Sequence, residues 1–146
     1  MQNSDTNIIS KISHIHSLCA DFLRVELNKT GLPNLASSHG FILYLLSQNK
    51  TLTMREISQK INRDKSTTTV LIKKLESLGY IKTASSPDDS RIKLVSLTPQ
   101  GISYNEATAS VSERLKKNFF NSLSESEIKN LAVTLDKISE NFSSIN

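Results

Sequence analysis

The hydrophobic pattern near the N-terminus predicts two helices. From Ile8 to Leu23, apolar residues recur in steps of three and four, which is the spacing of one helix face, and Gly31 with Pro33 ends this segment. A second helix is expected to follow Ser37 or Ser38 and to stop near Asn49. Its expected inward-facing residues are Phe41, Ile42, Leu45 and Leu46.

Two shorter helices are predicted in the middle third of the chain. Thr53 and Glu56 have the spacing of a capping box, so a helix should run from Met54 to about Ile61. After a tight break at 62–64, Asp64 can cap a longer helix that extends from 65 to about 78 and is closed by Gly79. The residues expected to face the core from this longer helix are Thr68, Leu71, Ile72, Leu75 and Leu78.

A hairpin and two further helices complete the predicted elements. Strands are expected at 80–83 and 92–97, joined by turn-forming residues at 85–90. Thr98 and Pro99 can open a long helix as cap and first position. A final helix should start at Ser124, with a capping box to Glu127. It is expected to bury Ile128, Leu131, Leu135, Ile138 and Phe142.

A short helix, a turn, a longer helix and a two-stranded hairpin follow one another in the order of a winged helix-turn-helix. The expected fold class is therefore mainly α (α+β). We expect one domain over 1–146, with the winged helix-turn-helix at about 36–98. The terminal helices, at about 5–30 and 99–146, carry apolar stripes with no further domain to pack against, so we expect them to form a homodimer.

The positive charge of the chain is concentrated in its middle third, which bears on the kind of partner to expect. The net charge is +4, and residues 51–100 hold nine Lys and Arg against five Asp and Glu. Such a patch suits a polyanion such as DNA, although a solvated charged face is the alternative. No apolar run is long enough for a membrane helix, and no secretory signal is evident, so we expect a cytoplasmic protein without a membrane partner.

The exposed face of the longer middle helix has the chemistry of a DNA-reading surface. Short hydroxyl and methyl groups allow close approach to base edges, and lysines can reach a guanine or a phosphate. The three successive threonines at 67–69 have weak helix propensity, so helix stability does not explain them. They favour a DNA-facing role over the alternative of a polar stretch without a function. The residues concerned are Lys65, Ser66, Thr67, Thr69, Val70 and Lys73.

Two stretches resemble the MarR family of transcriptional regulators, and the likeness extends over essentially the whole chain. Residues 87–101, Pro-Asp-Asp-Ser-Arg-Ile-Lys-Leu-Val-Ser-Leu-Thr-Pro-Gln-Gly, resemble the wing pattern of that family. Residues 64–80 resemble its recognition helix. The resemblance implies a winged helix-turn-helix regulator that binds double-stranded DNA, as a repressor released by a small aromatic or carboxylate effector.

Roles for individual residues follow from the resemblance. Arg91 would enter the minor groove from the wing tip, and Asp89 would hold the wing by pairing with Arg63 or Arg91. A weak, exposed Asp89–Arg91 turn pair is the alternative. The terminal helices would join two copies on a pseudo-palindromic operator. The complete expected DNA-binding set is Arg63, Lys65, Ser66, Thr67, Thr69, Val70, Lys73, Arg91 and Lys93.

Other function classes find less support in the sequence. Cys19 lies on an apolar stripe, where an inert thiol is usual, and His14, His16 and His39 do not make a complete zinc set, so redox or metal sensing remains only an alternative. No phosphate loop or catalytic triad is recognisable, and we expect neither an enzyme nor a cofactor. A winged helix used as a protein-interaction module is the remaining rival.

Overall fold

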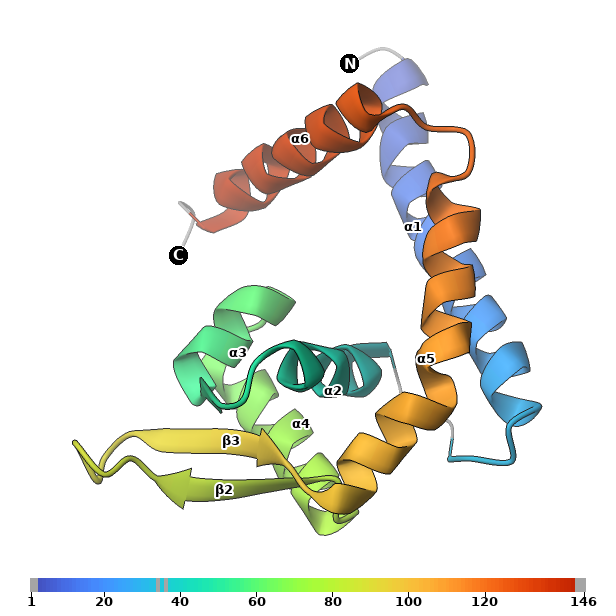
Figure 1. Ribbon diagram of the computed structural model, residues 1–146. Helices are drawn as coiled ribbons and strands as arrows, with labels where there is room; N and C mark the ends of the chain where they lie inside the picture. The colour runs from blue at the N-terminus through green and yellow to red at the C-terminus, as the bar shows by residue number, and fades with distance from the viewer. Residues whose placement is uncertain (1–2, 34, 36, 144–146) are drawn as a thin grey trace. The chain divides into compact units, whose positions relative to one another are not determined.

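The computed structural model describes residues 3–33, 35 and 37–143 (Figure 1). The chain forms two compact units, one ending at Ser112 and one beginning at Glu113, so the division falls within a helix. The expected single domain stays a prediction. In order, the elements of the described residues are α1 (Asn3–Asn28), α2 (Ser37–Gln48), β1 (Leu52–Thr53), α3 (Met54–Ile61), α4 (Lys65–Ser77), β2 (Ile81–Ser85), β3 (Lys93–Leu97), α5 (Pro99–Phe120) and α6 (Glu125–Ser143).

A small antiparallel sheet has the strand order β1-β3-β2. The hairpin strands β2 and β3 are paired from Ile81 opposite Leu97 to Ser85 opposite Lys93. The third strand, β1, pairs Leu52 with Val95 and was not predicted. A two-residue strand has no periodicity of its own, so its existence depends on the hairpin that it meets.

The core of the first unit joins α2, α3, α4 and the sheet. Its buried members include Ile42, Leu43, Leu46, Ile57, Ile72, Leu75, Ile81 and Val95. The expectation for α2 was wrong at Phe41, which is 43% exposed, whereas Leu43 is fully buried. Because α2 contacts α3, α4 and β3 together, its buried face is wider than a single helical stripe.

Local helix signals are confirmed around the turn between α3 and α4. Thr53 and Glu56 form the capping box that begins α3. Asp64 caps α4, and Gly79 follows that helix with a φ of 81°. Of the residues expected to anchor α4, Thr68, Ile72 and Leu75 are buried, and Leu71 and Leu78 are half-buried against the core.

The prediction of buried residues on α6 was wrong. Ser124 and Glu127 do form the expected capping box, with Ser124 N donating to Glu127 Oε2 at 2.7 Å. Yet no described residue of α6 is buried, because the second unit offers this helix only the end of α5 to pack against. The large apolar residues that remain exposed include Leu131, Leu135, Ile138 and Phe142, and Ile128 is half-buried.

Candidate nucleic-acid interface

The N-terminal turn of α4 is fixed by its cap and projects from the first unit. Asp64 Oδ1 accepts hydrogen bonds from the Thr67 amide at 2.7 Å and from Ser66 Oγ at 3.0 Å. These bonds hold the pKa of the Asp64 carboxyl below its usual value. Asn62, in the left-handed region at φ 54°, turns the chain from α3 into this cap. The first turn of α4 is therefore held by its cap, and its residues 65–67 are exposed.

The predicted reading residues lie opposite the buried face of α4. Burial of Thr68, Ile72 and Leu75 fixes the orientation of the helix. Val70 is 67% exposed, although it is apolar. Thr69 is half-buried, and the other exposed residues of the predicted set on α4 are Lys65, Ser66, Thr67 and Lys73. Arg63, in the turn before α4, is exposed as well.

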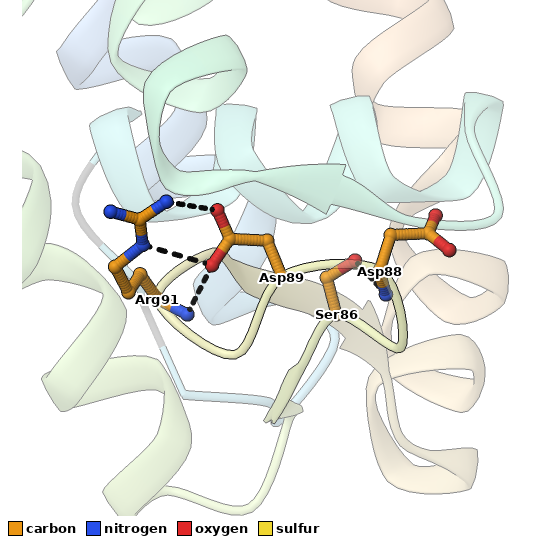
Figure 2. A network of polar contacts seen from close by, with 4 residues as sticks. All are labelled: Ser86, Asp88, Asp89 and Arg91. Atoms are coloured by element: carbon orange, nitrogen blue, oxygen red, sulfur yellow. Dashed lines mark hydrogen bonds and ion pairs between the residues drawn. The ribbon is translucent and has the colours of Figure 1, made fainter.

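The hairpin of β2 and β3 is here called the wing, and its tip is held by Asp89 and Arg91 (Figure 2). Asp89 Oδ1 accepts from the Arg91 amide at 3.0 Å and from Arg91 Nε at 3.1 Å, and Asp89 Oδ2 accepts from Arg91 Nη2 at 3.0 Å. Of the two arginines considered as partners of Asp89, the structure pairs it with Arg91.

Charge pairing at the wing tip leaves the arginine accessible. The Arg91 guanidinium holds the pKa of Asp89 below its usual value, and Asp89 raises the pKa of Arg91. The side chain of Arg91 is nevertheless 89% exposed, against 32% for Asp89. Beside them, Ser86 Oγ accepts from the Asp88 amide at 3.3 Å and closes the turn (Figure 2). Asp89 thus orients Arg91 without covering it.

Side-chain hydrogen bonds also tie the wing to α4. Thr83 Oγ1, on β2, donates to Glu76 Oε1 of α4 at 2.9 Å. Across the hairpin, Lys93 Nζ donates to Ser85 Oγ at 2.9 Å. The first bond fixes the hairpin against α4, and the second joins the two strands of the hairpin.

An open groove with a volume of about 710 Å³ lies between α3, α4 and the wing. Among the described residues of its lining, the carboxylate is Glu76 and the cations are Arg55, Lys65, Lys73, Arg91 and Lys93. Thr69 also lines it. Arg63, Ser66, Thr67 and Val70 are not part of this lining, but all four are exposed. The groove therefore presents a concentration of positive charge beside the exposed face of α4.

Sequence reasoning missed Arg55, Glu76 and Thr83 in this lining. A signal for Arg55 was available, because the capping box places it in the first turn of α3, two residues before the buried Ile57. The contact between Glu76 and Thr83 joins two elements, and no local pattern in the sequence reveals it.

The alternative sensing residues do not form a site among the described residues. Cys19 is half-buried in α1, and no group of three or more His, Cys, Asp or Glu residues is placed to hold a metal ion in the described part of the chain. Burial, with a smaller contribution from Lys74, lowers the pKa of His39. None of the described helices is long and apolar enough to cross a membrane.

Comparison with known proteins decides the family. Residues 35–93 match the sequence model of the MarR family, and this match contains α3, α4 and the tip of the wing. Residues 35–93 form a domain of the MarR family. Its fold is the winged helix-turn-helix of that family, mainly helical with the small antiparallel sheet.

Curated relatives of the chain are named as HTH-type transcriptional regulators or repressors. Over 104 residues, 71% of the chain, it is 31% identical to the uncharacterised HTH-type transcriptional regulator YdgJ of Bacillus subtilis and 27% identical to the HTH-type transcriptional repressor IacR of Pseudomonas putida. These matches span 63% and 62% of the two relatives, which is less than two thirds of their lengths.

A solved MarR family regulator from Streptomyces coelicolor, in complex with DNA, has the same fold. It superimposes with a TM-score of 0.80 at 18% identity, covering 97% of this chain and 93% of its own.

Proposed function

We propose that this MarR family chain is a transcriptional regulator that binds double-stranded DNA at specific sequences. The observation that carries the proposal is the groove, which is lined by five cationic side chains from α3, α4 and the wing and lies beside the exposed face of α4. Neutralising phosphates at such a surface releases counterions, which favours binding to a duplex.

The two parts of the interface have different roles in this proposal. An α-helix fits the major groove of B-DNA, so α4 reads base edges there, while Lys65 and Lys73 contact phosphates or guanines. The wing carries Arg91 to the adjacent minor groove, whose narrow A·T-rich form attracts a guanidinium. Arg63 and Lys93 add contacts to the phosphate backbone of the DNA, and Arg55 adds a further such contact from α3.

A homodimer supplies the symmetry that an operator of this kind needs. The terminal helices α1 and α6 expose rows of large apolar residues in the single chain, among them Ile8, Ile12, Ile15, Leu135 and Ile138. A second copy would cover them, because symmetric pairing is the usual solution for a self-complementary apolar surface. Two copies of α4 then bind half-sites about one helical turn apart on a pseudo-palindrome.

We further propose that the chain acts in the cytoplasm as a repressor and not as an enzyme. The relative from Pseudomonas putida carries the name of a repressor, and the relative from Bacillus subtilis that of a regulator. Release by a small aromatic or carboxylate effector remains part of the proposal through the family resemblance.

Selection from a random duplex library tests this function. The purified chain is expected to enrich one motif with two-fold symmetry, and Arg91→Ala is expected to enrich it less strongly. Two results together would contradict this function: no motif is enriched in the library, and the affinity for a duplex does not change with salt. They would instead favour a winged helix used for protein interaction.

A further inference from the structure

Three hydroxyl groups on the first turns of α4 already donate hydrogen bonds within the chain. Ser66 Oγ donates to Asp64 Oδ1 at 3.0 Å, and Thr69 Oγ1 donates to the Lys65 carbonyl at 2.8 Å. Thr68 Oγ1 donates to the Asp64 carbonyl at 2.8 Å and is buried. A hydroxyl has one proton to donate, so these three cannot also donate to the acceptor atoms of bases.

The centre of the exposed face therefore presents methyl groups. Val70 is 67% exposed, the same exposed fraction as Phe142 and Ile9 in the terminal helices. Unlike those two residues, Val70 directly follows the groove residue Thr69 in α4, the helix from which Lys65 and Lys73 also line the groove, although Val70 itself is outside the lining. Valine is also a weaker helix former than alanine or lysine, so helix stability does not account for its position.

The major groove offers one apolar group for such a surface, the 5-methyl of thymine. We propose that α4 recognises thymine methyl groups through Val70 and the methyl of Thr69, so that each half-site of the operator contains thymines where these side chains land. This proposal rests on the proposed DNA-binding function and specifies the chemistry that it reads. The lysines on either side supply affinity, and the methyl contacts supply discrimination.

Replacing thymine by deoxyuridine tests the proposal on the DNA side, because uracil lacks only the 5-methyl group. Each thymine of a selected operator is replaced in turn, and the dissociation constant is measured by fluorescence anisotropy at fixed salt. At one or two positions in each half-site, uracil should weaken binding of the wild-type protein about fourfold, the effect of one buried methyl group. Uracil at the remaining positions serves as the control.

Protein variants identify which side chain detects the methyl. Val70→Ala should bind the thymine and uracil duplexes equally at a sensitive position, and its thermal midpoint should not fall, since alanine favours the helix. Thr69→Ser and Thr69→Val form a matched pair. The serine variant keeps the hydroxyl and loses the methyl, so its preference for thymine should shrink, whereas the valine variant keeps the methyl and the preference.

Failure of the methyl proposal can be distinguished from failure of the proposed DNA-binding function. Wild-type protein that prefers its operator but tolerates uracil everywhere overturns the methyl proposal and leaves the DNA-binding function intact. The same holds if Val70→Ala and Thr69→Ser retain the full sensitivity to uracil. If the wild-type protein shows no sequence preference in any duplex, the proposed function fails and the methyl proposal fails with it.

Discussion

At the scale of single residues, Lys73 and Lys74 have the same chemistry in two different surroundings. Lys73 lines the groove beside the wing, whereas Lys74 lies on the side of α4 where its charge lowers the pKa of His39. One step along a helix turns a side chain through about a quarter of a circle, which is enough to separate these environments.

This difference predicts unequal effects on DNA binding. Lys73→Ala should weaken operator binding and, if Lys73 contacts a phosphate, reduce the slope of log affinity against log salt by about one. Lys74→Ala is the matched control and should leave both quantities close to the wild-type values. Binding isotherms at several salt concentrations measure both variants. If Lys73→Ala binds the operator with the same affinity and salt dependence as the wild-type protein, Lys73 is not part of the interface.

Arg91 is the second residue with a separable prediction. Its guanidinium is paired with Asp89 yet 89% exposed, so the pair orients it for the minor groove. Replacing A·T by G·C pairs where the wing lands should weaken the wild-type protein and barely affect Arg91→Ala. Arg91→Lys should recover only part of the loss, because an ammonium is more strongly hydrated. If the wild-type protein binds both operators equally, Arg91 is only a partner of Asp89.

At the scale of elements, the start of α5 is pressed against the loop that follows α4. Gly101 lies in the first turn of α5, and a Cβ there would collide with the Tyr80 carbonyl oxygen and meet Leu97 Cδ2 at 3.1 Å. In α2, a Cβ at Gly40 would meet no atom within 4 Å. The two glycines thus differ in what alanine would do.

Thermal or urea unfolding should show opposite effects for these substitutions. Gly101→Ala should lower the free energy of unfolding by about 2 kcal/mol or more, because the backbone must shift to admit the methyl group. Gly40→Ala should raise it by roughly 0.5–1 kcal/mol, because alanine restricts the unfolded chain and favours the helix. A stable Gly101→Ala protein would show that α5 and the loop do not pack as closely as described.

Elements with local signals could be predicted from the sequence, and those that depend on distant contacts could not. The ends of α3 and α4 follow from Thr53, Asp64 and Gly79, which cap helices through bonds within a few residues. The strand β1 and the groove contact between Glu76 and Thr83 join separate segments of the chain. In the candidate site, the exposed face of α4 could be predicted from its periodicity, and Arg55 could have been placed by the capping box at the start of α3, whereas the pairing of Glu76 with Thr83 depends on how the hairpin packs against α4.

At the scale of the whole molecule, the apolar stripes on α1 and α6 mark what a single chain leaves uncovered. The sequence alone suggested that α6 buries its stripe, and it does not do so within its own unit. Periodicity reports that a face is apolar but not which molecule covers it. The exposed stripes therefore support the proposal that a second copy covers them.

Sedimentation tests this pairing directly. At micromolar concentration, the protein should sediment as a species of about twice its 16.3 kDa chain mass. Ile138→Glu, on the apolar stripe, should shift it toward the monomer, while Lys137→Glu at the neighbouring exposed position should not. A 16.3 kDa species in the wild-type protein would contradict the dimer.

The measurement that tests the central claim most directly compares a selected operator with a scrambled duplex of the same composition across a range of salt concentrations. If the α4 and wing surface binds DNA specifically, the operator should be preferred by at least about a thousandfold at physiological salt. Affinity for both duplexes should fall steeply as salt rises, because the five groove cations displace counterions from phosphates. Equal affinity for the two duplexes, or affinity that does not depend on salt, would contradict the account.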